Sequence, residues 1–214
     1  MSGGSFNSPQ ILKLSGIGPR AELEQFGIPV VRDLPGVGTN LQDHYEISVI
    51  GITANDFPAL SRCTFGVGED PCLEEWRTAP RVGSIWGASY DAAGFGAAVH
   101  IKTSRAVQDN FDVLALGGPA QFIGYYPGYS ADAVAEKNYW SWVILKAHPR
   151  SRAGSVTLRS ADPLDVPNIN LEYFAEGEDD DLQAMYEGIQ FSREAYARQP
   201  VPVTETLPGA GRVS

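Results

Sequence analysis

The order of apolar and polar residues predicts short helices at the beginning of the chain, strands in its middle and one long helix near its end. Ser8 can cap a helix and Pro9 suits its first position, so residues 10–14 are expected to be helical. Residues 21–26 form a second short helix, which Gly27 closes. The first part of the chain therefore reads as helix, turn, helix.

From Tyr45 onwards the pattern changes to that of strands. Apolar residues mix with small or polar ones up to Ile52, and a stretch that is hard to interpret follows, in which residues 71–78 can form a helix. Further strands are expected at residues 97–102, 111–116, 139–148 and 155–159. Long strands joined by turn-rich connections favour an antiparallel sheet.

The last predicted element is a helix that begins near residue 178 and ends at Pro200. Four acidic residues at 178–181 lie at its start, where the helix dipole favours negative charge. Four apolar residues then fall on one face at helical spacing: Leu182, Met185, Tyr186 and Ile189. That face is expected to be the buried one.

Together these elements predict an α+β fold with an antiparallel sheet of about five or six strands and helices on one face. The chain divides into a first segment at residues 1–44, a main domain at residues 45–200, and a loosely held tail at residues 201–214. No internal repeat is visible.

Composition narrows the class of partner and the compartment. The 214 residues carry a net charge of −10, which would repel a phosphate backbone or an anionic membrane, so nucleic acid and membrane are excluded as partners. The sequence contains neither a signal peptide nor an apolar run long enough to cross a bilayer. We expect a cytoplasmic protein in which Cys63 and Cys72 stay reduced.

Several motifs that would indicate specific chemistry are missing from the sequence. No G-x-G-x-x-G follows a strand, because the glycine pairs at 16/18 and 36/38 lack a third glycine at the required distance. The three histidines, His44, His100 and His148, are far apart and show no metal-ligand spacing. We expect no metal site and no cradle for a dinucleotide phosphate.

The strongest candidate for acid–base chemistry is His44, which follows Asp43 in the glycine-rich loop 34–44. The neighbouring carboxylate could raise the pKa of the imidazole or fix its tautomer. Alternatively, Asp43 caps a turn and His44 packs beneath it.

Two groups of aromatic residues are candidates for ligand binding. Trp140 and Trp142 share a face of the expected strand with Ile144, Lys146 and His148. They either line an apolar pocket or form core against a covering helix. The second group lies in loop 121–129, and it is either the rim of a pocket or a loop anchored by buried rings: Phe122, Tyr125, Tyr126 and Tyr129.

The stretch GSFNSPQILKLSGIGP at residues 4–19 closely resembles the second signature of the glucose-methanol-choline (GMC) oxidoreductases, which are FAD-dependent alcohol oxidases and dehydrogenases. Other stretches are similar to the same family and follow in its order: LPGVGTNLQDH at 34–44, GYYPGYS at 124–130, KAHPRSRAGSVTL at 146–158 and RSADP at 159–163. The resemblance implies a substrate-binding sheet and a segment that approaches a flavin.

The departures from the family pattern shape the expected chemistry. The family's FAD fingerprint lies upstream of its second signature, and its catalytic histidine, with a partner histidine or asparagine, lies downstream of a segment like residues 205–209. None of the three histidines matches that catalytic position. We therefore expect a truncated member without the Rossmann half and without a cofactor, unless a partner chain supplies FAD.

Three functions follow from these expectations. The first is a cofactor-independent catalyst of the isomerase, cyclase, dehydratase or lyase type that acts on a hydrophobic small molecule. Its catalytic candidates are His44, Asp43, Tyr125 and Lys146, and its substrate-binding candidates are Phe122, Tyr126, Tyr129, Trp140, Trp142 and His148. The second is the substrate-binding half of a split FAD-dependent alcohol oxidoreductase. The third is a non-catalytic binding module or fragment.

The sheet face that the rest of the family covers would be bare in this chain. Large bare apolar faces are rare on monomers, so a homodimer or a partner chain is expected to cover it.

Overall fold

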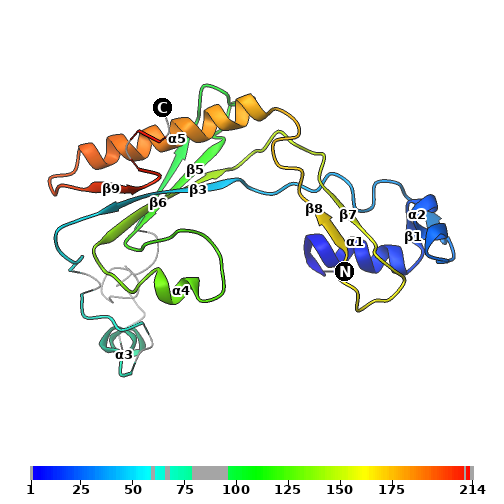
Figure 1. The fold of residues 1–214 in the computed structure, drawn as a ribbon, viewed down its shortest axis with the longest axis horizontal. Coiled ribbons are helices and arrows are strands. Elements are labelled where there is room, and N and C mark those ends of the chain that lie inside the picture. Colours follow the sequence, from blue (N-terminus) through cyan, green and yellow to red (C-terminus); the bar gives the residue numbers. More distant parts are fainter. Residues whose placement is uncertain (1, 59–60, 66–67, 79–95, 210, 213–214) are drawn as a thin grey trace. The chain divides into compact units, whose positions relative to one another are not determined.

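A computed structural model describes residues 2–58, 61–65, 68–78, 96–209 and 211–212 (Figure 1). The chain forms two compact units, each of which is described by itself. The first consists of Met1–Tyr45 and Pro149–Asp181, and the second of Glu46–His148 and Leu182–Ser214.

The first unit is built from short elements. They are α1 (Gly4–Leu14), β1 (Ile17–Gly18), α2 (Arg20–Gln25), β2 (Arg32–Asp33), β7 (Ser155–Thr157) and β8 (Asn168–Asn170). Strands β1 and β2 pair in parallel, whereas β7 and β8 pair antiparallel with Val156 opposite Ile169. Elements this short depend on contacts between them for their stability.

A buried lysine makes several of those contacts. The side chain of Lys13 in α1 is 2% exposed, and its Nζ donates hydrogen bonds to the Glu22 carboxylate at 2.7 Å and to the Val156 carbonyl at 2.6 Å. Glu22 in turn accepts the backbone N–H of Leu158 at 2.7 Å. Because a buried charge needs partners, Lys13 holds α1, α2 and β7 together.

The second unit is a five-stranded antiparallel sheet in the order β4-β5-β6-β3-β9. The strands are β3 (Glu46–Ile52), β4 (Ala97–Ile101), β5 (Val113–Gly118), β6 (Tyr139–Lys146) and β9 (Thr204–Leu207). The helices are α3 (Pro71–Thr78), α4 (Tyr129–Asp132) and α5 (Glu178–Ala197), the last of which belongs to this unit from Leu182 onwards.

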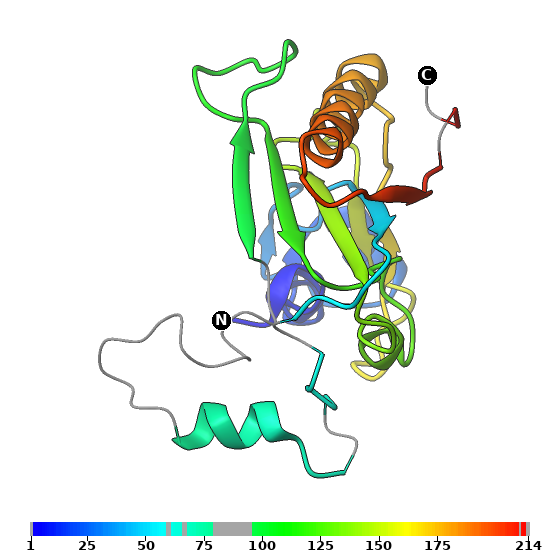
Figure 2. The same ribbon diagram turned by 90° about the vertical axis from the view of Figure 1, so that its left-hand side faces the viewer.

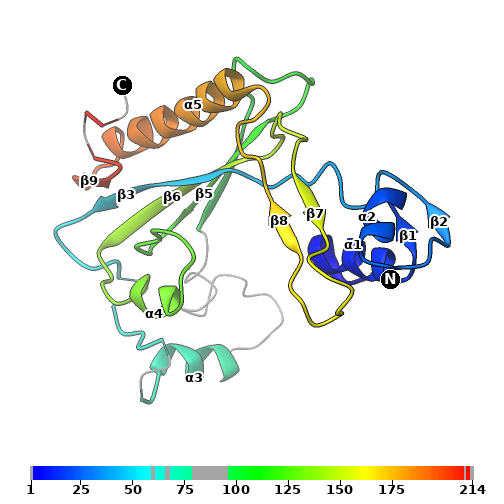
Figure 3. The same cartoon turned by 45° about the vertical axis from the view of Figure 1, so that its right-hand side comes forward.

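Helix α5 lies against one face of the sheet and does so very closely (Figure 3). Small residues four positions apart, Ala184, Gly188 and Ser192, are fully or almost fully buried along the helix. A Cβ atom at Gly188 would lie 2.5 Å from Cγ2 of Ile144 in β6. This face of the sheet, called the α5 face below, therefore forms the core.

The opposite face, called the open face below, carries Glu46, Ser48 and Ile50 of β3, because neighbouring residues of a strand alternate between faces. The loop at 119–135, which contains α4, lies on this side of the sheet (Figures 1 and 3). The Ser141 hydroxyl of β6 fastens the loop, since it donates to the Ala120 carbonyl at 2.6 Å and accepts the Phe122 N–H at 3.0 Å.

A second buried lysine lies on the α5 face. Lys146 Nζ is 3.0 Å from Oδ2 of Asp112, whose carboxylate also accepts the backbone N–H and the hydroxyl of Thr103 at 2.8 and 2.7 Å. Burial, the largest single influence, raises the pKa of Asp112, but these hydrogen bonds together outweigh it and hold the pKa below its ordinary value. Lys146 therefore forms a buried ion pair with Asp112 that stabilises the fold.

The structure confirms the predicted α+β fold and the antiparallel sheet. The helix expected at residues 71–78 is α3, and the four strands expected at 45–52, 97–102, 111–116 and 139–148 all form with bounds shifted by a few residues. The predicted strand at 139–148 ends at Lys146, so His148 falls outside its alternation. The residues at 79–94 of the stretch that was hard to interpret lie outside those described.

The buried face of α5 agrees in part with the one that periodicity indicates. Met185 and Ile189 are buried as expected, at 7% and 3% exposed, whereas Leu182 is 47% exposed. The small residues Ala184 and Ser192 are completely buried as well. Periodicity analysis follows large apolar side chains, but the closeness of the sheet also selects small ones here.

The chain also divides differently from the three expected segments. Residues 149–181 join the first unit, because β7 contacts α1 and pairs with β8. The tail expected to be loose instead contributes β9, which adds to the edge of β3 with Leu207 opposite Ile50 (Figure 2). Both differences arise from pairing between residues far apart in the sequence.

The two cysteines do not stay reduced as expected. Cys63 and Cys72 form a disulfide, both are fully buried, and the Asp70 carboxylate accepts the backbone N–H of Cys72 at 3.0 Å. The expectation of free thiols was wrong because the nine-residue separation allows the chain to fold back on itself. The cytoplasmic location rested partly on reduced thiols and loses that support. Within the described residues, no helix has the length and apolar character that spanning a bilayer requires.

Gly188→Leu is expected to lower the free energy of unfolding by about 1–3 kcal/mol, because the added side chain has no room between α5 and β6. The matched control Ala197→Leu adds the same side chain at an exposed position of the same helix and should change stability by less than about 0.5 kcal/mol. Urea unfolding followed by circular dichroism measures both. Equal stabilities of the two variants would contradict the close packing.

Lys146→Met is expected to lower the free energy of unfolding by about 3–5 kcal/mol, because it leaves the Asp112 carboxylate buried without its cation. Lys102→Met, which removes an exposed ion pair with Asp109, is the control and should cost less than about 1 kcal/mol.

The same pair predicts a pH dependence. The pKa of Asp112 is lower in the folded state than in the unfolded state, so its contribution to stability is complete above about pH 4 and is lost as the pH falls through the folded value. Unfolding measured over this acid range should show a steeper loss for the wild type than for Lys146→Met. Parallel curves would exclude this role for Lys146.

Candidate functional site

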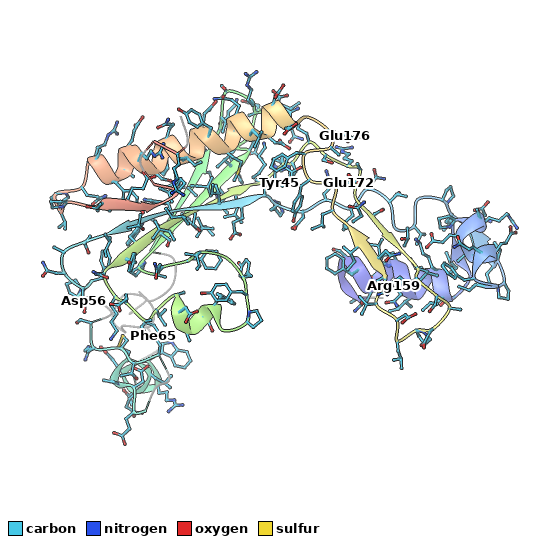
Figure 4. All side chains as sticks on the ribbon, in the orientation of Figure 1. Tyr45, Asp56, Phe65, Arg159, Glu172 and Glu176 are labelled. Carbon is cyan, nitrogen blue, oxygen red and sulfur yellow. A yellow bond between two sulfur atoms is a disulfide. The ribbon has the colours of Figure 1, made fainter. Side chains whose placement is uncertain are left out.

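The loop that carries Asp43 and His44 is anchored within the first unit. One carboxylate oxygen of Asp43 accepts the backbone N–H of His44 at 2.9 Å, and the other accepts the hydroxyl of Tyr173. Burial and the hydrogen bond to Asp43 raise the pKa of Tyr173 to about 12. Tyr45, labelled in Figure 4, packs its ring on Tyr173 and Phe174 with centroids 5.2 and 4.3 Å away. The backbone bond agrees with a capping role for Asp43, but His44 is exposed and does not pack beneath the turn.

The first unit contains a cavity of about 460 Å³ between α1 and the loop at 37–42. Hydroxyl and amide side chains lie on its wall: Ser5, Ser8, Thr39, Asn40 and Gln42. Such groups can exchange hydrogen bonds with the polar parts of a ligand.

Two places in this unit where a diphosphate might bind are filled by protein groups. Gly38 has a positive φ of 84°, and a Cβ there would lie 2.3 Å from the Val156 carbonyl, so this glycine packs against protein. The start of α2 is occupied by Asp33, whose carboxylate accepts the backbone N–H of Arg20 at 3.1 Å. These two places are therefore closed to a phosphate, whereas the start of α1 has no side-chain cap and a Cβ at Gly4 would meet nothing within 4 Å.

On the open face of the second unit, a carboxylate lies close to a cluster of rings. The aromatic cluster consists of Phe122, Tyr125, Tyr126 and Tyr129, whose neighbouring rings meet edge to face with centroids 5.0–6.5 Å apart. The negative charge of Glu46 is the main cause of a raised pKa at Tyr125. Tyr125 is 73% exposed, so burial does not anchor its ring, and the exposed part of the cluster resembles a rim.

The two tryptophans lie on the α5 face, where both alternatives for them hold. Trp142 is buried and meets Phe191 of α5 edge to face at 5.5 Å, as core does. Trp140 and Trp142 also line a mostly apolar cavity of about 370 Å³. His148 lies beyond β6 with its ring 6.3 Å from Phe111, which stacks on His100 at 4.1 Å.

The residues proposed for catalysis do not come together within either unit. Asp43 and His44 belong to the first unit, whereas Tyr125 and Lys146 belong to the second. Within the second unit, Tyr125 lies on the side of the open face and Lys146 is buried on the α5 face with Asp112. Lys146 is thus not within reach of the same ligand as Tyr125.

Sequence reasoning missed Glu46, the charged residue of the open face beside the aromatic cluster. A signal for it existed, because strand alternation from Ile50 back to Glu46 assigns both residues to one face. What the sequence did not reveal is that the loop at 119–135 would return to that end of β3.

Curated relatives match almost the whole chain. It is 34% identical over 197 residues to an oxygen-dependent choline dehydrogenase from Burkholderia lata, a match that covers 92% of this chain and 32% of the relative. It is 31% identical over 214 residues to an oxygen-dependent choline dehydrogenase from Pseudomonas putida, covering 98% of this chain and 35% of the relative. The chain thus spans about a third of the length of these relatives.

Solved structures share the fold at lower identity. Formate oxidase from Aspergillus oryzae RIB40 matches with a TM-score of 0.73 and 22% identity, over 98% of this chain and 39% of that one. Pyridoxine 4-oxidase from Mesorbium loti matches with a TM-score of 0.65 and 20% identity, over 98% of this chain and 35% of that one.

These similarities overturn the expectation that the protein takes no cofactor. FAD is named for the formate oxidase structure, and residues 1–46 match the N-terminal family model of the GMC oxidoreductases, which is the FAD-binding one. The missing glycine fingerprint is evidence only about where a diphosphate binds, so the conclusion drawn from it was wrong. The hydroxyls and amides of the first unit's cavity fit one side of a flavin nucleotide. The turn at Gly38 and the start of α2 are not open to its diphosphate.

The C-terminal family model of the GMC oxidoreductases matches residues 149–214. Together the two models cover just over half of the chain, one at each end. The chain belongs to the GMC oxidoreductase family.

Proposed function

We propose that this protein is the substrate-facing part of an FAD-dependent alcohol oxidoreductase. The observation that carries the proposal is that both ends of the chain match the GMC family. The negative charge of Glu46, which acts on Tyr125 of the aromatic cluster, supports it. A bound flavin would supply the hydride acceptor for the carbon that carries the substrate hydroxyl. The residues of this chain bind and orient the alcohol.

The open face suits an alcohol that carries a positive charge. Choline, named for the relatives, combines a hydroxyl with a quaternary ammonium that donates no hydrogen bond. A carboxylate and the π-systems of aromatic rings are the groups that hold such a cation. Glu46 supplies the carboxylate, and Phe122, Tyr125, Tyr126 and Tyr129 supply the rings.

The first unit would meet the flavin through its cavity. Ser5, Ser8 and Thr39 offer hydroxyls, and Asn40 and Gln42 offer amides that can bind polar groups of the nucleotide. We assign the diphosphate to a nucleotide-binding portion outside the described residues, such as the partner chain expected from the sequence. The acid–base roles of His44 and Asp43 stay predictions.

Glu46→Gln is expected to weaken choline binding about fivefold, because it removes the negative charge beside the rings. Binding of 3,3-dimethyl-1-butanol, which has the same shape without charge, should be unchanged. Glu194→Gln on α5 removes an exposed carboxylate elsewhere and is the control. Titration calorimetry at low salt measures all three proteins, and an equal loss for both alcohols would contradict a role for the charge.

The isolated 214-residue chain, incubated with excess FAD and passed through gel filtration, is expected to retain little flavin absorbance, since protein groups fill the turn at Gly38 and the start of α2. Adding the nucleotide-binding partner should give a stoichiometric flavin spectrum that bleaches when the alcohol is added. Full retention of flavin by the chain alone would mean that its own residues hold the diphosphate.

A further inference from the structure

The cavity on the α5 face lies where four separate stretches of the second unit meet. Its walls come from the residues that follow β3, from β6, from the end of α5, and from the stretch before β9. Its volume of about 370 Å³ falls within the range of about 300–1,000 Å³ that is usual for small-molecule sites. The cavity opens on the other side of the sheet from Glu46 and Tyr125, so it does not rest on the proposed function.

Aromatic rings dominate this cavity. Trp140 lies between two of them, with its ring centroid 6.0 Å from Trp142 and 5.7 Å from Phe57. The Tyr196 hydroxyl is hydrogen-bonded to the carbonyls of Val49 and Trp140, at 2.9 and 2.8 Å. Only the ring of Tyr196 is therefore available to a ligand in the cavity. Val201 and Val203 complete the apolar wall.

Few polar residues line the cavity, and the charge among them is negative. Asp56, labelled in Figure 4, is exposed and is the one formally charged residue among those described on the cavity wall. The hydroxyl of Thr53 lies 2.8 and 3.1 Å from the carbonyls of Asn55 and Asn138, to which it donates. A ligand would therefore meet a carboxylate and ring faces, with no cation to bind an anion.

We infer that this cavity binds a small aromatic amine, with its ring among Trp140, Trp142 and Phe57 and its ammonium near Asp56. Tryptophan is the strongest cation–π partner among the side chains, and a ring is stabilised by edge-to-face contact with others. The net charge of −10 adds an attraction for cations over the whole molecule. The same lining disfavours an aromatic acid, whose carboxylate Asp56 would repel.

Three probes that share one ring test the inference on the 214-residue protein: 2-phenylethylamine, 2-phenylethanol and phenylacetate. Calorimetry and tryptophan fluorescence should show the amine binding about fivefold more tightly than the alcohol and phenylacetate binding most weakly. Asp56→Asn should remove the advantage of the amine and leave the alcohol unchanged. Val201→Trp, which fills the cavity from a half-exposed position, should weaken both.

Two controls distinguish Asp56 from other exposed carboxylates. Glu194→Gln on α5 and Asp109→Asn remove carboxylates that are not on the cavity wall and should leave amine binding unchanged. Circular dichroism establishes that each variant is folded. Amine binding that survives both Asp56→Asn and Val201→Trp, that falls equally in Glu194→Gln, or that is no tighter than phenylacetate binding would overturn the inference.

Discussion

The close approach of α5 to the sheet is the constraint on which the second unit depends. On α5, the residues that face the sheet include Ala184, Gly188 and Ser192, which have small side chains or none. The sheet in turn has glycines at positions where large side chains come close to its backbone. A Cβ at Gly117 would lie 2.7 Å from the Trp142 ring, and one at Gly51 would lie 2.3 Å from Val203. Packing at this distance leaves no freedom for the sheet to turn its other face inwards.

Once α5 defines the core, the two faces of the sheet acquire different chemistry. The α5 face holds the rings of Trp140 and Trp142 and the buried pair of Lys146 with Asp112. The open face holds Glu46 at one end of β3, under the loop that carries the aromatic cluster. A charged residue can stay on the open face because water reaches it there, whereas on the α5 face a charge persists only with a partner.

The first unit also contains a buried lysine whose charge is stabilised by a partner. Lys13 lies in the stretch that resembles the GMC signature, and its ion pair with Glu22 joins helices that are too short to be stable alone. Part of this signature thus has a structural role, which leaves the cavity beside α1 as the part available for a ligand. Family membership and the position of that cavity support the proposed contact with a flavin.

The sequence by itself determined the elements and the family. Alternation and acidic residues are local signals, so the order of residues is enough to locate α3, α5 and four strands of the sheet. The cap predicted at Ser8 was wrong, because α1 begins at Gly4 and contains Pro9. Likewise, the quoted motifs identified a GMC oxidoreductase. The missing G-x-G-x-x-G motif led to the wrong expectation that the protein takes no cofactor, because a missing motif is evidence only about the residues of the sequence in which it is sought.

Only the tertiary structure decided which residues meet. Leu182 follows helical spacing and is exposed, the tail becomes β9, and Lys146 turns from a catalytic candidate into the partner of Asp112. Glu46 and Tyr125 are 79 positions apart, and no local pattern relates them. Such contacts depend on the closing of long loops and on the space left between packed elements. Local patterns of neighbouring residues reveal neither of these.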